Sequence, residues 1–378
     1  MLYELIHWIE KMYQPPGFSA FEFITIRTGM AAATALIISL LIGGRIIRWL
    51  EKMQLRETIR EDIGLDRHLE KSETPTMGGV IILMAILIPA LLWMPMDSVY
   101  TWTIIIVTFL LGLVGFVDDY IKVIREDKTG LRGRFKLFGQ IVVGLGFGCV
   151  IYFWPEFQKF HTLTTLPLLK NVNIDYAIFG DALGWLIYIP VVILVITATS
   201  NAANLTDGLD GLAAGTSAIA GIVLGIFAYV SGRTDFSSFL NIMYLPGAGE
   251  LTIFCASIVG ACLGFLWYNA HPASVFMGDT GSLALGGSFG AIALILHKEL
   301  LLPIICGIFF VEAVSVIVQT GWYKYTKRKY SVGRRVFLMA PLHHHFEKRG
   351  WAESKIVVRF WILAILLGIV SLLTLKLR

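Results

Sequence analysis

Charged residues are scarce in this sequence. Asp, Glu, Lys and Arg together make up 15% of its 378 residues, whereas a typical soluble domain contains about 25%. Hydrophobic residues account for 56% of the chain, so a water-soluble fold would lack the polar side chains needed to cover its surface. The composition therefore excludes a soluble globular protein and a disordered chain, and it indicates a protein that crosses a membrane several times.

Cysteine is also rare, and the usual nucleotide-binding patterns are missing. The four cysteines all lie inside apolar runs, where packing is their expected role and no disulfide scaffold is indicated: Cys149, Cys255, Cys262 and Cys306. The chain has no Walker loop and no Rossmann glycine fingerprint, so neither ATP nor NAD is expected as a cofactor. No basic patch alternates with aromatic residues, so no nucleic-acid partner is expected.

The chain contains ten long apolar runs. A bilayer core of about 30 Å needs about 20 mostly apolar residues per helix. Runs of this kind lie near 24–47, 77–95, 99–117, 137–154, 183–199, 211–230, 250–270, 282–297, 301–323 and 356–375. We therefore predict an all-α, polytopic integral membrane protein with about ten transmembrane helices, which form a single domain over residues 1–378.

Most basic residues lie on one side of this predicted bundle. With ten spans both termini share one side, and the five loops on the other side hold 23 of the chain's 31 Lys and Arg residues. These loops lie near 45–76, 118–136, 199–210, 268–282 and 322–359. The positive-inside rule makes this the cytoplasmic side, which places both termini on the extracytoplasmic side.

The same five loops contain most of the groups capable of chemistry. The first loop ends in the segment 71–79 (KSETPTMGG), in which Lys71 and Thr76 precede an apolar helix. The free N–H groups and partial positive charge of a helix N-terminus suit a phosphate. An ordinary N-cap at a membrane boundary is the alternative explanation.

Two adjacent carboxylates, Asp118 and Asp119, stand at the end of the third apolar run. Acidic residues are costly at this position, and the pair could bind Mg²⁺ through its oxygens or act as a base. If the helix continues, Lys122 shares a face with Asp118. A solvated helix end with one salt bridge is the alternative. Lys136 belongs to a basic cluster that either anchors the membrane boundary or meets a phosphate.

The third cytoplasmic loop contains no basic residue. In its segment 201–211 (NAANLTDGLDG), Asn204, Asp207 and Asp210 recur every three residues and would line one side of a helical turn. Gly208 permits close approach of the backbone to a ligand. This arrangement suits a metal ion or a sugar, and a polar turn is the alternative.

The fourth loop, 269–282 (NAHPASVFMGDTGS), also lacks Lys and Arg. Asp279 stands between glycines just before the next apolar run, so it is a candidate metal ligand, with a helix cap as the alternative. Phe276 could stack on a base or simply anchor the chain at the membrane interface.

The last loop contains three adjacent histidines, His343, His344 and His345. Zinc binding is not favoured, because cysteine partners are absent and adjacent side chains cannot all face one ion. Histidines in such a loop can hydrogen-bond phosphates or a sugar. Glu312 lies inside the ninth apolar run and must find a partner there, either for packing or for function.

Acids from three of these loops and bases from the others would converge at one membrane face. The acids are Asp118, Asp119, Asp207, Asp210 and Asp279. Such a set predicts a Mg²⁺-dependent reaction on phosphates, in which positioning and charge neutralisation supply most of the catalysis.

Several of these motifs resemble a known enzyme family. The stretches 118–122 (DDYIK), 204–211 (NLTDGLDG) and 276–282 (FMGDTGS) resemble the polyprenyl-phosphate N-acetylhexosamine-1-phosphate transferases. The segments 341–347 (PLHHHFE) and 71–79 resemble one branch, the phospho-N-acetylmuramoyl-pentapeptide transferases. The resemblance runs from about residue 20 to the end, with no departure at a motif position.

The resemblance implies an enzyme of the bacterial cytoplasmic (inner) membrane that acts in peptidoglycan synthesis. It would transfer phospho-N-acetylmuramoyl-pentapeptide from UDP-MurNAc-pentapeptide to undecaprenyl phosphate, giving lipid I and UMP. The implied cofactor is Mg²⁺ and the active site lies on the cytoplasmic face. The implied fold is ten transmembrane helices, usually in a homodimer.

The resemblance also implies roles for individual residues. Asp279 is expected to bind Mg²⁺, with Asp118 and Asp119 as further metal ligands, and all three acids are expected to be catalytic, Asp118 as the base for the lipid phosphate. His343, His344 and His345 are expected to be catalytic residues near the sugar phosphate. A further set is expected to bind substrate: Lys71, Thr76, Lys122, Lys136, Asn204, Asp207, Gly208, Leu209, Asp210, Asn269 and Phe276. Direct attack by the lipid phosphate is favoured, and a covalent Asp intermediate stays open.

Two other functions fit parts of the sequence. A related transferase that uses UDP-N-acetylglucosamine would share the general motifs but not the histidine triplet or the 71–79 segment. An ion-coupled transporter would place its acids at mid-membrane depth, whereas these five acids lie at loop junctions.

Overall fold

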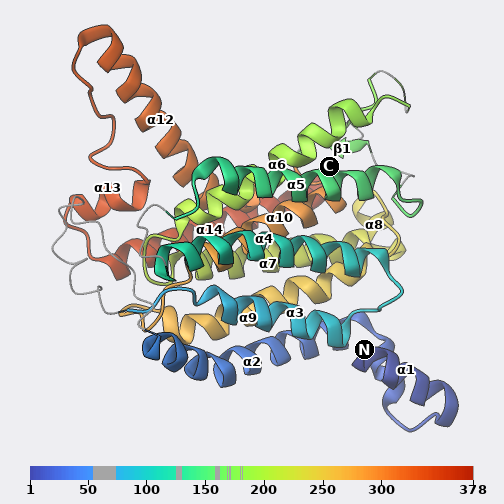
Figure 1. Ribbon diagram of the computed structural model, residues 1–378. Coiled ribbons are helices and arrows are strands. Elements are labelled where there is room, and N and C mark those ends of the chain that lie inside the picture. Colours follow the sequence, from blue (N-terminus) through green and yellow to red (C-terminus); the bar gives the residue numbers. More distant parts are fainter. Residues whose placement is uncertain are drawn as a thin grey trace.

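The computed structural model describes residues 1–53, 74–124, 130–157, 162–167, 169, 172–178, 180 and 182–377. Within this part the chain is mainly helical, and Figure 1 shows a bundle of long helices that lie roughly alongside one another. The prediction of a largely α-helical membrane protein is confirmed in this coarse form.

The long helices coincide with the ten apolar runs, and shorter helices lie between them. Their bounds are α1 Leu2–Tyr13, α2 Ile24–Lys52, α3 Gly79–Trp93, α4 Val99–Ile124, α5 Gly133–Phe153, α6 Trp185–Thr206, α7 Leu212–Ser231, α8 Thr234–Leu240, α9 Leu251–Asn269, α10 Gly278–Ile295, α11 Leu302–Ile305, α12 Gly307–Tyr330, α13 Leu342–Lys348 and α14 Glu353–Leu377. Short 3₁₀ segments lie at Phe18–Glu22 and Ala248–Glu250. The ninth run is divided at Cys306 into α11 and α12.

Seven of these helices, among the residues that the structure describes, are long and apolar enough to cross a membrane. They are α2, α4, α5, α6, α7, α9 and α14. α3 is apolar but has only 15 residues. The chain is therefore a multi-pass membrane protein, while the count of ten spans and the side of each terminus stay predictions. Figure 1 shows N and C toward the same end of the bundle, which an even number of spans requires.

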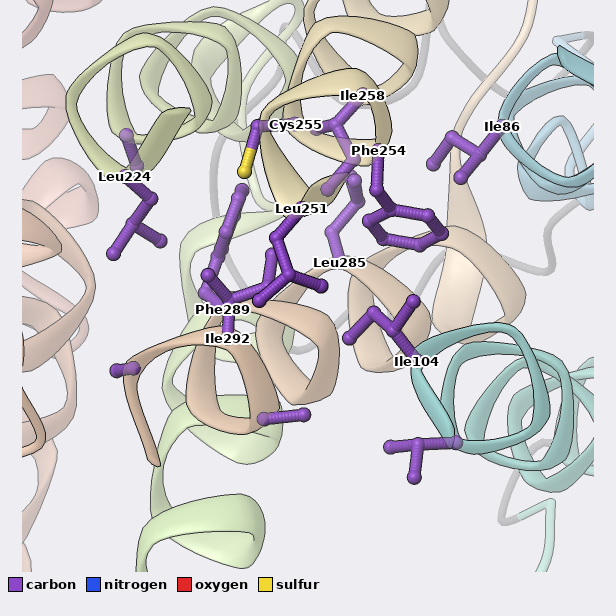
Figure 2. Close-up of a cluster of buried hydrophobic side chains, with 14 of the residues drawn as sticks. Ile86, Ile104, Leu224, Leu251, Phe254, Cys255, Ile258, Leu285, Phe289 and Ile292 are labelled. Carbon is purple, nitrogen blue, oxygen red and sulfur yellow. The ribbon is translucent and has the colours of Figure 1, made fainter. Parts of the chain in front are cut away.

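α10 lies at the centre of the bundle and is buried along its length after its first residue. Its apolar side chains Leu285, Phe289 and Ile292 meet residues of α9, α7, α4 and α3, as Figure 2 shows. Gly286 and Gly287 have no room for a Cβ, which would overlap the Thr199 carbonyl of α6 and the Leu111 side chain of α4. Small residues allow such close helix packing in membranes, where lipid is as apolar as the helices.

The segment between α5 and α6 is not helical throughout. The segment between α5 and α6 contains the antiparallel strands β1 (Leu163–Thr165) and β2 (Asn173–Asp175), with Thr164 opposite Ile174. The all-α prediction is wrong for this hairpin. Its strands have only three residues each, too few for a period-of-two pattern to stand out in the sequence.

Candidate active site

The end of α4 meets the beginning of α10 at one end of the bundle. Three carboxylates gather there, Asp118, Asp119 and Asp279, with exposed fractions of 2%, 2% and 7%. Each offers one oxygen within 4.8 Å of the others. Gly115 makes this approach possible, because a Cβ at that position would overlap the Asp279 backbone. We call these three residues the acidic centre.

Asp119 holds the first turn of α10. Its carboxylate accepts hydrogen bonds from the Asp279 N–H at 3.0 Å, the Thr280 N–H at 2.8 Å and the Thr280 hydroxyl at 2.6 Å. The first N–H groups of a helix have no partner within the helix, so Asp119 satisfies them from α4. Both oxygens are engaged in this way, and Asp119 therefore positions Asp279.

Two lysines neutralise the other two acids. Lys122 Nζ lies 2.7 Å from Asp118 Oδ2 and 3.0 Å from Asp279 Oδ2. Lys136 Nζ lies 2.6 Å from Asp279 Oδ2 and 3.8 Å from Asp118 Oδ2. The predicted i,i+4 pair of Asp118 and Lys122 is present. Lys136 comes from α5, so the basic cluster there serves more than membrane anchoring.

The end of α6 completes the acidic centre. The Asn204 amide donates to Asp279 Oδ1 and, at 2.9 Å, to the Ser282 hydroxyl. Lys136 Nζ lies 3.4 Å from Asn204 Oδ1. Asp207 follows as the half-buried residue that ends α6. Ser282 and Thr280 cannot be selected from the sequence alone, because hydroxyls at a helix start are typical of ordinary caps.

The turn between α6 and α7 forms a second polar group beside the first. Asp210 Oδ2 lies 2.9 Å from His271 Nδ1 and accepts the Ala273 N–H at 3.2 Å. Glu353 of α14 accepts the Asp210 N–H at 2.8 Å and lies 3.6 Å from His271. His271 and Glu353 were not singled out from the sequence, because neither belongs to a spaced acidic pattern.

Two more of the expected substrate residues are committed to packing. The Leu209 side chain is 4% exposed and lies in an apolar cluster with residues of α12 and α14. Asn269, 3% exposed, accepts the Gly211 N–H at 3.0 Å and donates to the Val275 carbonyl at 2.8 Å. Asn269 thereby ties the third cytoplasmic loop to the fourth.

The chain just before α3 runs along the fourth loop. The Phe276 N–H donates to the Pro75 carbonyl at 2.9 Å, and the Gly78 N–H donates to the Phe276 carbonyl at 2.8 Å. This pairing brings Thr76, which is buried, beside the half-buried Phe276. Lys71, expected in the same subsite, lies outside the described residues.

The three histidines have different surroundings. His343 is 1% exposed and its Nδ1 lies 3.2 Å from Glu312 Oε1. His344 Nδ1 faces Glu347 Oε2 at 2.6 Å, so the carboxylate requires a proton on Nδ1. His345 Nδ1 accepts the Leu338 N–H at 3.1 Å, which places the proton of the neutral ring on Nε2.

These surroundings separate the roles that the histidines can have. His344 and His345 are half-buried at the α13 surface, whereas His343 lies beneath it. Burial, and to a smaller extent the charge of Arg349, lowers the pKa of His345. His345 is therefore a neutral hydrogen-bond donor through Nε2 near pH 7. Contact with a substrate stays a prediction for His344 and His345, and the buried position of His343 argues against it there.

The acidic centre can bind a phosphorylated substrate at the end of a membrane bundle. Its lysines and carboxylates present both charge signs within a few ångströms, which suits reactions in which negative charge is moved between phosphates. Four of the five acids predicted to converge lie in two separate groups: Asp118, Asp119 and Asp279 in one, and Asp210 in the other.

Comparison with known proteins identifies close relatives. Residues 101–297 match the family described as Glycosyl transferase family 4, and residues 71–83 match the Phospho-N-acetylmuramoyl-pentapeptide-transferase signature 1. Proteins named Phospho-N-acetylmuramoyl-pentapeptide-transferase from Salinibacter ruber and Chloroherpeton thalassium are each 51% identical to the chain. The protein of the same name from Flavobacterium psychrophilum is 47% identical to the chain. In all three cases the match covers 100% of both chains.

Proposed function

The chain belongs to the phospho-N-acetylmuramoyl-pentapeptide-transferase family, and from that premise we propose how its acidic centre works. The protein is a phosphoglycosyl transferase that moves phospho-N-acetylmuramoyl-pentapeptide from its UDP carrier to undecaprenyl phosphate. The products are lipid I and UMP, in the first membrane step of peptidoglycan synthesis. The observation that carries the mechanism is the pairing of Asp118 and Asp279 with Lys122 and Lys136 at the end of the bundle.

The reaction exchanges one phosphoanhydride bond for another. An oxygen of the lipid phosphate attacks the phosphorus that carries the sugar. The bond from that phosphorus to the UMP oxygen breaks, and UMP leaves with the bonding electrons. Negative charge grows on the leaving UMP, where Lys122 and Lys136 are available to offset it as they now offset Asp118 and Asp279.

The donor set fits Mg²⁺. Mg²⁺ prefers carboxylate oxygens and is usually held by one or two carboxylates together with substrate phosphates. Asp279 and Asp118 offer such oxygens, and the lysine nitrogens beside them support a site that accommodates positive charge. Asp119 contributes by holding Asp279 in place. When bound, the ion would neutralise the diphosphate and orient it for the attack.

Asp118 is better placed as a base than as a nucleophile. One of its oxygens accepts the Leu131 N–H at 2.7 Å and the other meets Lys122 at 2.7 Å. These two contacts fix the carboxylate, and each oxygen keeps a second lone pair that can accept the proton of the lipid phosphate. We therefore favour direct attack by the lipid phosphate, with Asp118 as the base.

The remaining polar residues are assigned to the nucleotide and the sugar. Phe276, Thr76 and Asp210 lie around the fourth loop and would receive the uridine. Lys71, Gly208 and Leu209 would lie at the edge of this uridine site. Leu209 would contribute through its backbone. Asn269 acts by joining the loops. Asn204 and Asp207 would line the path to the diphosphate. His344 and His345 would hydrogen-bond the sugar phosphate.

The setting follows from the acceptor. Undecaprenyl phosphate keeps its tail in the lipid, so the acidic centre must lie at the membrane surface. The excess of basic residues at this end of the bundle supports the cytoplasmic face of the bacterial inner membrane. A single catalytic domain that spans residues 1–378, ten spans with both termini outside, and a homodimer complete the proposal.

UMP release tests this function. The purified protein in detergent should release UMP from UDP-MurNAc-pentapeptide only when undecaprenyl phosphate is present, and EDTA should abolish the release. UMP release from UDP-N-acetylglucosamine alone would contradict the choice of sugar nucleotide. Ion transport in vesicles without UMP formation would contradict the enzymatic function altogether.

A further inference from the structure

One buried carboxylate outside the acidic centre has no role in this mechanism. Glu312 lies within α12 and is 0% exposed. Its Oε2 accepts a hydrogen bond from the Leu342 N–H, and its Oε1 accepts one from the His343 N–H at 3.1 Å. The same Oε1 lies 3.2 Å from His343 Nδ1. Each of these contacts joins α12 to the first turn of α13.

Glu312 replaces the cap that α13 lacks. The first N–H groups of a helix have no partner within it, and a side chain next to the helix usually accepts them. Here the preceding residue is Pro341, which makes no side-chain cap. A charged acceptor forms stronger hydrogen bonds than a neutral one. The position of α13 is therefore set by a residue of a different helix.

His343 extends this anchor toward the acidic centre. Its ring lies directly against Gly208, where a Cβ would overlap His343 Nε2. Gly208 belongs to the turn that follows α6, and Asn204 at the end of α6 donates to Asp279. A continuous series of contacts thus runs from Glu312 through His343 to the Gly208 turn. Asn204, just before that turn, contacts Asp279 of the acidic centre.

We propose that Glu312 is a positioning residue of the transferase. By accepting the Leu342 and His343 N–H groups it fixes α13, which carries His344 and His345, and so holds the His343 ring against the Gly208 turn. This role rests on the proposed function. Because Glu312 is buried and does not reach the polar surface, it should govern the rate of the bound complex and leave substrate binding largely unchanged.

Kinetics of a Glu312 variant test the role. Glu312→Ala should lower kcat about 100-fold, as expected for a displacement of catalytic groups by roughly 1 Å, and should change KM less than about threefold. The matched control is Ser315→Ala, since the Ser315 hydroxyl donates back to the Glu312 carbonyl of its own helix, at 2.7 Å. This control should keep wild-type kcat. Glu312→Gln retains one acceptor oxygen, so it should fall between them, and it replaces the Ala variant if that variant does not fold.

A double-mutant cycle tests whether the effect passes through His343. Glu312→Ala and His343→Ala should be strongly non-additive, so that the double variant is little slower than the worse single variant. Glu312→Ala combined with His345→Ala should be more nearly additive. Additive losses for Glu312 and His343, or a Glu312→Ala kcat within about threefold of wild type, would overturn the proposal.

Hydrogen exchange tests the anchor without any assay of activity. In Glu312→Ala the Leu342 and His343 amides lose their acceptors, so a peptide covering α13 should exchange faster than in wild type. Ser315→Ala should leave that exchange unchanged. Equal exchange in wild type and Glu312→Ala would overturn the proposal even if the protein is active. Absence of UMP release from wild type would instead remove the proposed function, and exchange would still decide on the anchor.

Discussion

The two ends of α10 both carry buried carboxylates, and the protein neutralises them in different ways. At the start of α10, Asp279 is 7% exposed and meets two lysines and an asparagine. Just beyond its end, Glu299 is 6% exposed, and its Oε1 accepts the Tyr176 hydroxyl at 3.3 Å. Glu299 Oε2 has no hydrogen-bond partner in the part of the chain that the structure describes.

Lysine is present at both ends but serves different partners. Lys122 and Lys136 contact carboxylates directly. The buried Lys298 instead donates to the Thr165 hydroxyl of β1 at 2.9 Å. The Thr165 hydroxyl in turn donates to the His297 carbonyl at 2.8 Å. At this end the polar groups tie the hairpin to the bundle.

The difference shows how similar residues can serve chemistry or structure. The ammonium groups of Lys122 and Lys136, which both contact Asp279, favour the ionised form of that carboxylate, as metal binding requires. Burial has the opposite effect on Glu299 and raises its pKa to about 7. We therefore propose that the end of α10 with ion pairs is the reactive one and that the end with Glu299 is structural.

The largest loss is expected at the acidic centre. Asp279→Asn should lower the rate of UMP release by at least about 1,000-fold and remove its dependence on Mg²⁺ concentration, because the variant loses its charged metal ligand. Steady-state assays across a Mg²⁺ series would measure this, with unchanged elution in size-exclusion chromatography as the folding control. Near-normal rates would take Asp279 out of the metal site.

The half-buried Lys136 and the buried Lys298 offer the next contrast. Lys136→Met should lower kcat about 100-fold, because Asp279 and the leaving phosphate lose a counter-charge. Lys298→Met is the matched control at the other end of α10, where no phosphate is expected. It should lower the thermal stability while leaving kcat close to wild type. Equal losses of kcat in both variants would erase the distinction between the two ends.

A smaller effect is expected at the residue that holds the first turn of α10. In Asp119→Asn the new amide group faces N–H and hydroxyl donors, so roughly 1–3 kcal/mol of stability should be lost. The activity should fall less than in Asp279→Asn, because Asp279 is displaced but still present. Denaturation and UMP release, measured on the same preparation of each variant, would compare the loss of stability with the loss of activity. A loss of activity as large as that of Asp279→Asn, with unchanged stability, would make Asp119 a direct ligand.

The smallest effect on activity is expected at Glu299. Its pKa of about 7 in the folded protein exceeds the ordinary value of 4.5. As the pH rises, the Glu299 carboxyl therefore loses its proton in the unfolded chain before it does so in the folded protein. The Glu299 contribution therefore lowers stability progressively as pH rises from about 4.5 to about 7 and stays constant above that, for a total of roughly 3 kcal/mol.

Glu299→Gln isolates this contribution. The amide does not titrate, so the variant should lose the part of the pH dependence that wild type shows between those values, while kcat stays within about twofold. Thermal midpoints across the pH range would show the difference. Parallel stability curves for both proteins would contradict the assignment.

The sequence was sufficient for the helices and for much of the acidic centre. Apolar runs of about 20 residues have few stable alternatives in lipid, since every backbone group must be bonded internally. That constraint fixed the helix positions. The local spacing of Asp118 and Lys122 predicted their pairing, because it depends on one helix alone.

Partners from other helices could not be predicted. Lys136 meets Asp279 across 143 positions, and Glu312 meets His343 across 31. Such pairs depend on which helices pack together, which hydrophobicity does not specify when most faces are apolar. The different surroundings of His343, His344 and His345 could not be predicted for the same reason. Three adjacent histidines in a sequence do not indicate which ring faces inward.

The central claim is that the start of α10 is catalytic and its far end is structural. The most direct measurement is UMP release from UDP-MurNAc-pentapeptide and undecaprenyl phosphate by wild type, Asp279→Asn and Glu299→Gln, over a Mg²⁺ series at one pH. We expect wild type and Glu299→Gln to follow the same curve and Asp279→Asn to remain inactive at every Mg²⁺ concentration. An active Asp279→Asn, or a Glu299→Gln as inactive as Asp279→Asn, would contradict the claim.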